Sequence, residues 1–325
     1  NRCGTAVTGA YGTLTIGADG SYTYVASSDI SGLSDGATVS DTFTYTLSDG
    51  TATTTADLVL TIIGGAASNQ SPVAVNDTDS VNENASVTKT GAQNDVLNDD
   101  SDPDGDTIRV DQIQHSSAAS GTSVSNNTTY GASGTTTGTT VTGTYGQLTI
   151  GSDGSYVYSA NQTAAEALAA GVQADDVFTY RITDGSATAT ATLTITVTGV
   201  NDAPVAVDDT DSVNENETVT KTGSQNDVLN DDTDTDTSAS LSVSNISHTN
   251  GNSGSVSSSS TYNSSGTQIV GTYGTLTIGA DGSYSYAADQ AAADAIAAGE
   301  SQNDVFVYTI TDGTQDNTAN ITIKV

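Results

Sequence analysis

Hydrophobic and polar residues alternate with a period of two along most of this 325-residue chain. Leu148 and Ile150 share one face of a short run, a Gly-Ser-Asp-Gly sequence follows at 151–154, and Tyr156 and Tyr158 resume the alternation. Such alternation is typical of strands with one buried face, and a glycine-containing interruption marks a turn. The pattern therefore predicts a β-hairpin with a four-residue loop.

A second hairpin is predicted further along the chain. Phe178, Tyr180 and Ile182 alternate with polar residues up to an Asp-Gly turn at 184–185, and another alternating run begins at Leu193. Between the two hairpins, the alanine-rich stretch from Thr163 to Ala170 has a polar N-cap candidate and a glycine after its end, which predicts a short helix. Asp289 to Gly299 repeats this helical pattern.

The chain is built from internal repeats. The motif Tyr-Gly-x-Leu-Thr-Ile-Gly-x-Asp-Gly-Ser-Tyr begins at Tyr11, Tyr145 and Tyr273. Its recurrence predicts three copies of one structural unit: a partial first repeat at 1–68 and complete repeats at 69–200 and 201–325. The first repeat starts near the equivalent of residue 135 and lacks the amino-terminal half of the unit. We expect the natural chain to contain residues before Asn1 that supply this half.

Each complete repeat contains seven or more short strands, closely spaced turns and one short helix. This combination predicts an all-β fold of tandem antiparallel β-sandwiches. The tyrosines at 22, 24, 156, 158, 284 and 286 are expected to pack in the core or across strands, and a carbohydrate-stacking surface is the alternative. The Ser, Thr and Gly tracts at 116–140 and 247–266 are expected to form surface loops or irregular edge strands.

Composition excludes several kinds of partner. Six Lys and Arg stand against 39 Asp and Glu, for a net charge of −33. This charge repels nucleic acid and anionic lipid and favours cations. No apolar run approaches the length of a membrane span, so membrane insertion is not expected. Cys3 is the only cysteine, which leaves it without an intrachain disulfide partner; it is either incidental or available to another molecule.

Carboxylates are concentrated between residues 94 and 110. Asp102, Asp104 and Asp106 occupy every second position, and Gly105 permits a sharp turn. Calcium takes six to eight oxygen ligands in flexible geometry, so this spacing predicts a calcium site. Together with Asp100, the segment also matches the start of an EF-hand loop, but the flanking sequences do not predict the two helices of that motif. A solvated acidic loop is the alternative interpretation.

Several motifs recur in one order at the junctions between repeats. Val-Asn-Asp-Ala-Pro at 200–204 is followed by Val-Asn-Glu-Asn at 213–216, and then by an acidic segment related to that at 94–110. Together with Gly-x-Asp-Gly-Ser-Tyr, these motifs resemble the bacterial cadherin-like and VCBS-type tandem repeats of large surface proteins. The resemblance implies immunoglobulin- or cadherin-like sandwiches.

The resemblance also implies calcium between consecutive repeats. It places Glu83, Asn201, Asp202, Asp234 and Asp236 at the junction of the second and third repeats. It places Asn69, Asp102 and Asp104 at the preceding junction, and Glu215 corresponds to Glu83 in the third repeat. Asn69-Gln70 replaces the Asn-Asp pair, and Asp236-Thr237 replaces Asp104-Gly105, so we expect unequal affinities.

No catalytic motif is found, and an enzyme is not expected. The sequence contains no phosphate-binding Gly-x-x-x-x-Gly-Lys loop, no Gly-x-Ser-x-Gly elbow and no His-Glu-x-x-His helix. His115 and His248 occupy equivalent positions and are interpreted as surface residues of the scaffold.

Two functional hypotheses remain. The first is a calcium-rigidified stalk or spacer of a secreted or bacterial cell-surface adhesin-like protein, whose recognition of a surface or matrix ligand lies elsewhere. The second is a self-assembling subunit of an extracellular filament or surface layer. The expected partners are calcium ions and neighbouring repeats or copies of the same chain.

Overall fold

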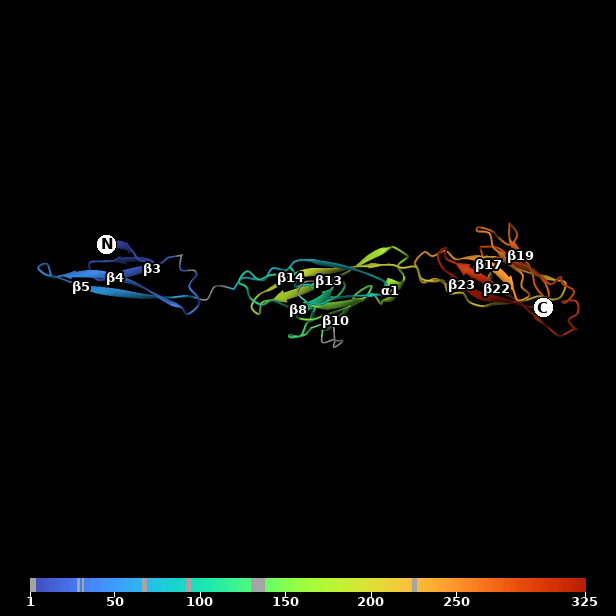
Figure 1. Ribbon diagram of the computed structural model, residues 1–325, viewed down its shortest axis with the longest axis horizontal. Helices are drawn as coiled ribbons and strands as arrows, with labels where there is room; N and C mark the ends of the chain where they lie inside the picture. The colour runs from blue at the N-terminus through green and yellow to red at the C-terminus, as the bar shows by residue number, and fades with distance from the viewer. Residues whose placement is uncertain are drawn as a thin grey trace. The chain divides into compact units, whose positions relative to one another are not determined.

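The structure, a computed structural model, describes residues 4–27, 30, 32–65, 69–91, 95–129, 138–223 and 227–325. The chain divides into two compact units, Asn1–Gln70 (unit 1) and Ser71–Val325 (unit 2). Unit 2 holds the second and third repeats, and Figure 1 shows its strands in cyan through red. Cys3 lies outside the described residues.

The second repeat is a sandwich of two sheets. One sheet has the order β10-β11-β12-β7 and the other has the order β6-β14-β13-β8-β9. The strands are β6 (Asp77–Asn82), β7 (Ser86–Lys89), β8 (Arg109–His115), β9 (Thr122–Ser123), β10 (Thr139–Thr142), β11 (Gln147–Ile150), β12 (Tyr156–Ser159), β13 (Gln173–Thr183) and β14 (Thr188–Thr198). The expected hairpins are β11–β12, joined by five residues rather than four, and β13–β14.

Strict alternation explains the core of this sandwich. In β13, Phe178, Tyr180 and Ile182 are fully buried, while the residues between them are partly exposed. Tyr156 and Tyr158 on β12 are also buried, as are their equivalents in the third repeat, Tyr284 and Tyr286. The expected role of these tyrosines in core packing is therefore confirmed in unit 2.

The third repeat reproduces this architecture with sheets β15-β23-β22-β17-β18 and β16-β21-β20-β19. Its strands are β15 (Asp209–Ser212), β16 (Thr218–Lys221), β17 (Ser242–His248), β18 (Ser253–Ser255), β19 (Thr267–Val270), β20 (Thr275–Ile278), β21 (Tyr284–Ala287), β22 (Asn303–Thr311) and β23 (Asp316–Lys324). Each repeat thus encloses its own hydrophobic core.

The helices are shorter than the sequence predicts. α1 (Thr163–Glu166) forms only the first turn of the stretch expected to run to Ala170, and it is the one helix in the part of the chain that the structure describes. Residues 291–295 of the third repeat form turns instead of the predicted helix. An alanine-rich run this short has too few hydrogen bonds to offset the cost of nucleating a helix.

One pairing in each complete repeat is parallel rather than antiparallel. β6 pairs with β14 from Leu193↔Asp77 to Thr198↔Asn82, and β15 pairs with β23 in the same sense. The first strand of each repeat therefore lies beside its last strand. All other strand pairs between the described residues are antiparallel.

Both histidines are buried, so their interpretation as surface residues is wrong. His115 is 3% exposed, and its Nε2 lies 2.9 Å from Asp176 Oδ1. Asp176 also accepts a hydrogen bond from the Tyr158 hydroxyl at 2.7 Å. His248 makes the equivalent contact with Asp304. A buried carboxylate needs several donors, and histidine supplies one of them from β8 or β17.

The strands described in unit 1 correspond to β10–β14 of the second repeat. These are β1 (Thr5–Thr8), β2 (Gly12–Ile16), β3 (Tyr22–Ala26), β4 (Thr38–Ser48) and β5 (Thr53–Ile63). The described residues form a three-stranded sheet, β1-β2-β3, and a β4–β5 hairpin. No strand among them corresponds to β6, β7 or β8.

Candidate metal centre between the second and third repeats

Glu83 reaches the junction from the turn that follows β6. The backbone turns sharply at Asn84, whose φ of +57° lies in a region that asparagine tolerates better than most residues. The Glu83 side chain is 4% exposed, and its Oε1 accepts a hydrogen bond from the Val200 amide at the start of the linker. Glu83 is therefore held in place by the linker that follows β14, the last strand of its own repeat.

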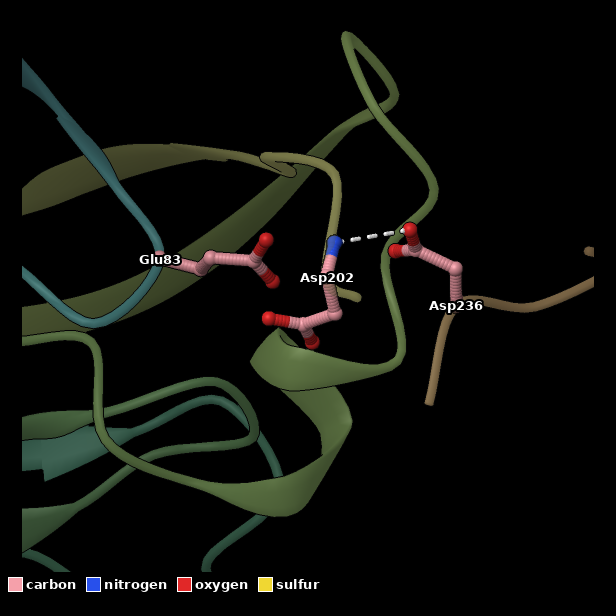
Figure 2. Close-up of side chains that lie close together, drawn as sticks. All are labelled: Glu83, Asp202 and Asp236. Atoms are coloured by element: carbon pink, nitrogen blue, oxygen red, sulfur yellow. Dashed lines mark hydrogen bonds between the residues drawn. The ribbon is translucent and has the colours of Figure 1, made fainter. Parts of the chain in front are cut away.

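Asp202 in the linker and Asp236 in the acidic loop of the third repeat complete a three-carboxylate cluster. The Asp202 amide donates to Asp236 Oδ2 at 3.0 Å. One oxygen from each of Glu83, Asp202 and Asp236 lies within 4.8 Å of the others. Figure 2 shows the Glu83 and Asp202 carboxylates pointing toward each other, with Asp236 on the other side of Asp202. Two consecutive repeats and their linker thus contribute to one site.

Several carboxylate oxygens at this junction are buried without a hydrogen-bond partner. They are Glu83 Oε2, Asp234 Oδ2 and Asp236 Oδ1. A buried anionic oxygen without a donor is strongly unfavourable, since its hydration has been lost without replacement. A hard divalent cation offers the missing interaction to all three, so the donor set fits calcium.

The electrostatics of the cluster favour a cation as well. Burial raises the pKa of Glu83 above its ordinary value, and the charges of Asp202, Asp236 and Glu166 raise it further. Burial likewise raises the pKa of Asp202, with added repulsion from Asp236 and Glu166. The neighbouring charges thus make Glu83 and Asp202 harder to ionise, and a bound cation would reverse this effect.

Glu166 is a neighbour of this site that was not predicted from the sequence. It is the last residue of α1 and partly buried. Its charge acts on both Glu83 and Asp202. The available signal was its place as the only carboxylate within the alanine-rich stretch, with Asp294 at the equivalent position of the third repeat.

Two further residues attach the repeats to each other. The Thr237 amide and hydroxyl both donate to the Ala167 carbonyl oxygen, which lies just after α1. Asn201 Nδ2 donates to Asp312 Oδ2 at 2.8 Å, so its amide group anchors the linker to the β22–β23 turn. Thr237, where the second repeat has Gly105, therefore adds a contact between repeats.

The acidic loop of the second repeat brings together Asp102, Asp104 and Asp106. Asp102 Oδ1 accepts from the amides of Asp104 and Asp106, while its Oδ2 is buried without a partner. Gly105 has a φ of +79°, which confirms the expected turn. The turn differs from that of its counterpart in the third repeat, where the residue with a positive φ (+72°) is Ser238 and not Thr237.

Three other predicted ligands lie apart from these clusters. Asp100 accepts a hydrogen bond from the Val75 amide at 2.7 Å, and its carboxylate lies near the Tyr180 hydroxyl. It therefore holds the first residues of the second repeat beside β13. Glu215 is exposed and lines a cavity of about 230 Å³ with Val325 in the third repeat. Asn69 belongs to unit 1, where its Nδ2 donates to the Gln70 carbonyl oxygen.

The sequence profile of the bacterial cadherin-like domain matches residues 69–199 and 201–325. The chain belongs to the bacterial cadherin-like domain family. The profile of a bacterial Ig domain matches residues 3–61, which lie in unit 1. Domains of these two families are typically non-enzymatic. They are typical of surface or extracellular proteins, in which they have adhesive or structural roles.

Cadherins are among the similar solved structures. Mouse protocadherin-24 EC1-3 is 15% identical with a TM-score of 0.42, over 96% of this chain and 85% of that one. Drosophila N-cadherin EC1-4 is 11% identical with a TM-score of 0.32, over 100% and 67%. An endo-fucoidan hydrolase from glycoside hydrolase family 107, MfFcnA4, is 17% identical with a TM-score of 0.26, and this chain spans 38% of its length. These likenesses concern the fold alone.

No curated protein matches the sequence. Among the described residues, no helix is long and apolar enough to cross a membrane.

Proposed function

We propose that the second and third repeats form a calcium-stiffened spacer within an adhesin-like protein of the bacterial surface. The observation that carries this proposal is the set of buried, unpartnered carboxylate oxygens on Glu83, Asp234 and Asp236, contributed by two consecutive repeats. Asp202, in the linker, forms a three-carboxylate cluster with Glu83 and Asp236. Because the ligands come from both repeats, one ion constrains the angle between them.

The mechanism follows from charge. Without a cation, Glu83 and Asp202 repel Asp236 and each other, which opposes close approach of the two repeats. A calcium ion shared by these carboxylates turns the repulsion into attraction. It also binds only the arrangement in which all ligands meet, so it stabilises that arrangement by RT ln(1 + [L]/Kd), about 2.7 kcal/mol at a hundredfold excess over Kd.

Calcium titration of the whole chain tests this function. We expect calorimetry to detect binding that Glu83→Gln weakens strongly, and small-angle scattering to show fewer conformers with calcium than with a chelator. Asp175→Asn is the matched control, because Asp175 is exposed on β13 and accepts a hydrogen bond from the Thr196 hydroxyl across the hairpin. Identical scattering profiles with calcium and with chelator would rule out the spacer mechanism.

The filament hypothesis has one supporting observation, the sandwich of unit 1, in which the outer edges of β3, β4 and β5 pair with no other strand among the described residues. Electron microscopy of the chain in calcium separates the two functions. Single particles at all concentrations support the spacer, whereas filaments support the self-assembling subunit.

A further inference from the structure

The linker between the second and third repeats is bound by side-chain amides of the β22–β23 hairpin. Gln315 Nε2 donates to the Asn201 carbonyl oxygen at 2.7 Å, and Asn317 Nδ2 donates to the Pro204 carbonyl oxygen at 2.8 Å. From the linker side, Asn201 Nδ2 donates to Asp312 Oδ2 in the turn of the same hairpin. Three amide groups therefore hold the linker against one hairpin, and we call this set, Asn201, Gln315 and Asn317, the amide clamp.

The two hairpin amides are particular to the third repeat. The Asp-Gly turns at 184–185 and 312–313 align the hairpins of the two complete repeats, so Gln315 and Asn317 correspond to Ala187 and Ala189. An alanine side chain has no hydrogen-bond donor. The β13–β14 hairpin nevertheless forms over its full length. The fold of the hairpin thus does not require these amides, and their contacts serve the linker.

The contacts of the linker change from one repeat to the next between Val200 and Asn201. The Gly199 amide donates to the Val172 carbonyl oxygen of the second repeat, and the Val200 amide donates to Glu83. Asn201, the next residue, is bound to the third repeat through both its carbonyl oxygen and its side chain. A change in the angle between the repeats that preserves these contacts is therefore confined to the backbone torsions around the Val200–Asn201 peptide.

The amide clamp fixes the backbone on both sides of Asp202, a member of the three-carboxylate cluster. The carbonyl oxygens of Asn201 and Pro204 are both held, and Asn201 Nδ2 also donates to the Asp202 carbonyl oxygen at 2.7 Å. The Asp202 amide donates to Asp236, as Figure 2 shows. Ordering a free backbone costs conformational entropy at every residue, so a linker that is held before an ion arrives leaves less of this cost to ion binding.

We propose that Gln315 and Asn317 are positioning residues for the cation at the junction. They hold the linker on the third repeat in the absence of the ion, so that Asp202 already lies beside Asp236 and the second repeat has only to supply Glu83. Neither side chain is a ligand, and each acts through the linker backbone. The identity of the ion rests on the proposed function, whereas the amide clamp is formed by residues of the third repeat alone.

Gln315→Met in the whole chain tests whether the amide clamp holds the linker, because it keeps the length of the side chain and removes the donor. Hydrogen exchange of the Asp202 amide is measured in a chelator, where calcium contributes nothing. We expect this amide to exchange at least about fivefold faster in the variant, the fold-change that corresponds to one lost hydrogen bond. Gln268→Met is the matched control, since Gln268 is exposed on β19 and its side chain donates to Thr277 of the neighbouring strand.

Calorimetric titration with calcium measures the positioning role. We expect Gln315→Met to weaken binding about fivefold, and the double variant with Asn317→Ala to weaken it about 20-fold, since each change removes one hydrogen bond to the linker. A merely structural role would lower the midpoint of urea unfolding equally with and without calcium. We therefore expect the difference between parent and variant to be larger in calcium than in the chelator.

Three results would overturn the proposal. Unchanged exchange at Asp202 in Gln315→Met would show that the amide clamp does not hold the linker. Faster exchange with an unchanged calcium affinity would show that holding the linker has no consequence for the ion. A parent chain that binds no calcium would overturn the proposed function and the positioning role with it. This last failure is distinguishable, because exchange at Asp202 in the chelator would still respond to Gln315→Met.

Discussion

The backbone amide of Asp202 donates to the Asp236 carboxylate at 3.0 Å, so the linker is already bound to the acidic loop of the repeat that follows it. This hydrogen bond uses Oδ2 of Asp236 and leaves Oδ1 buried without a partner. One oxygen positions the carboxylate, and the other is the one that would bind the cation in the proposed function.

Asp236→Asn is expected to reduce calcium affinity at the junction at least about tenfold, because it replaces a charged ligand and leaves a buried amide in its place. Calorimetric titration measures the change. Asp104→Asn is the internal comparison: Asp104 is exposed, whereas Asp236 is 8% exposed. We therefore expect the smaller loss for Asp104, and equal losses would contradict a junction-specific role for Asp236.

Thr237→Val tests the contact between repeats. It removes the hydroxyl that donates to the Ala167 carbonyl oxygen and preserves the shape of the side chain. We expect the thermal stability of unit 2 in calcium to fall by about 1 kcal/mol, the typical contribution of such a hydrogen bond. Thr220→Val is the control for loss of a hydroxyl within one repeat, because Thr220 is exposed on β16 and its hydroxyl donates to Ser285 of the same repeat. If Thr237→Gly instead raised the calcium affinity of the junction, calcium would bind better with glycine at this position, as in the second repeat. The contact that Thr237 makes would then not contribute to calcium binding.

His115→Ala is expected to destabilise the second repeat by about 2–4 kcal/mol, since it leaves a cavity beside Phe178 and removes a donor from buried Asp176. Denaturant unfolding measures the change, and the neighbouring Gln114→Ala is the control. A loss below about 0.5 kcal/mol is what a surface histidine would give, and it would contradict the buried network.

Acid is expected to stabilise the third repeat when calcium is chelated. Burial raises the pKa of Asp209 to about 7, with a lowering contribution from the Tyr308 hydroxyl and a raising one from Asp231 and Asp232. Because the folded state holds this proton and the unfolded state releases it near pH 4, stability is lost as pH rises from about 4 through 7. Urea unfolding at several pH values measures the slope.

Asp209→Asn provides the check on this assignment. The variant keeps an acceptor for the Tyr308 hydroxyl, which lies 2.9 Å from Asp209 Oδ2, and removes the titrating group. We expect a flatter dependence of stability on pH. A slope identical to that of the parent chain would mean that other carboxylates control the response.

The strands were predictable because alternation can be read from neighbouring residues. The repeats were predictable because the same motif recurs along the chain. The phase of alternation also carried a signal for His115, which lies two residues after buried Ile113 and therefore on the same face. β8 has a bulge where it pairs with Arg181 and Ile182 of β13. Because of this bulge, Val110 is buried three residues before Ile113, and the buried positions of β8 do not follow a regular period of two.

The assembly of the candidate site was less accessible from the sequence. Glu166 approaches Glu83 only because α1 and the turn after β6 lie at the same end of the sandwich. Likewise, no local pattern distinguishes Thr237 as a donor to Ala167, 70 residues away. Such contacts depend on how two repeats dock, which alternation does not encode. The resemblance to cadherin-like repeats supplied Asp202 and Asp236, whereas Asp100 proved to close its own repeat.

The parallel pairing of first and last strands has a consequence for mechanics. When a repeat is pulled from its two ends, β6 and β14 slide along each other, and their hydrogen bonds are loaded together in shear rather than opened one after another. The ladder joins six residue pairs in the second repeat and four between β15 and β23 in the third. The second repeat should therefore resist the greater force, whereas unit 1, without a strand corresponding to β6 among its described residues, lacks a parallel ladder loaded in this way within that part of the chain.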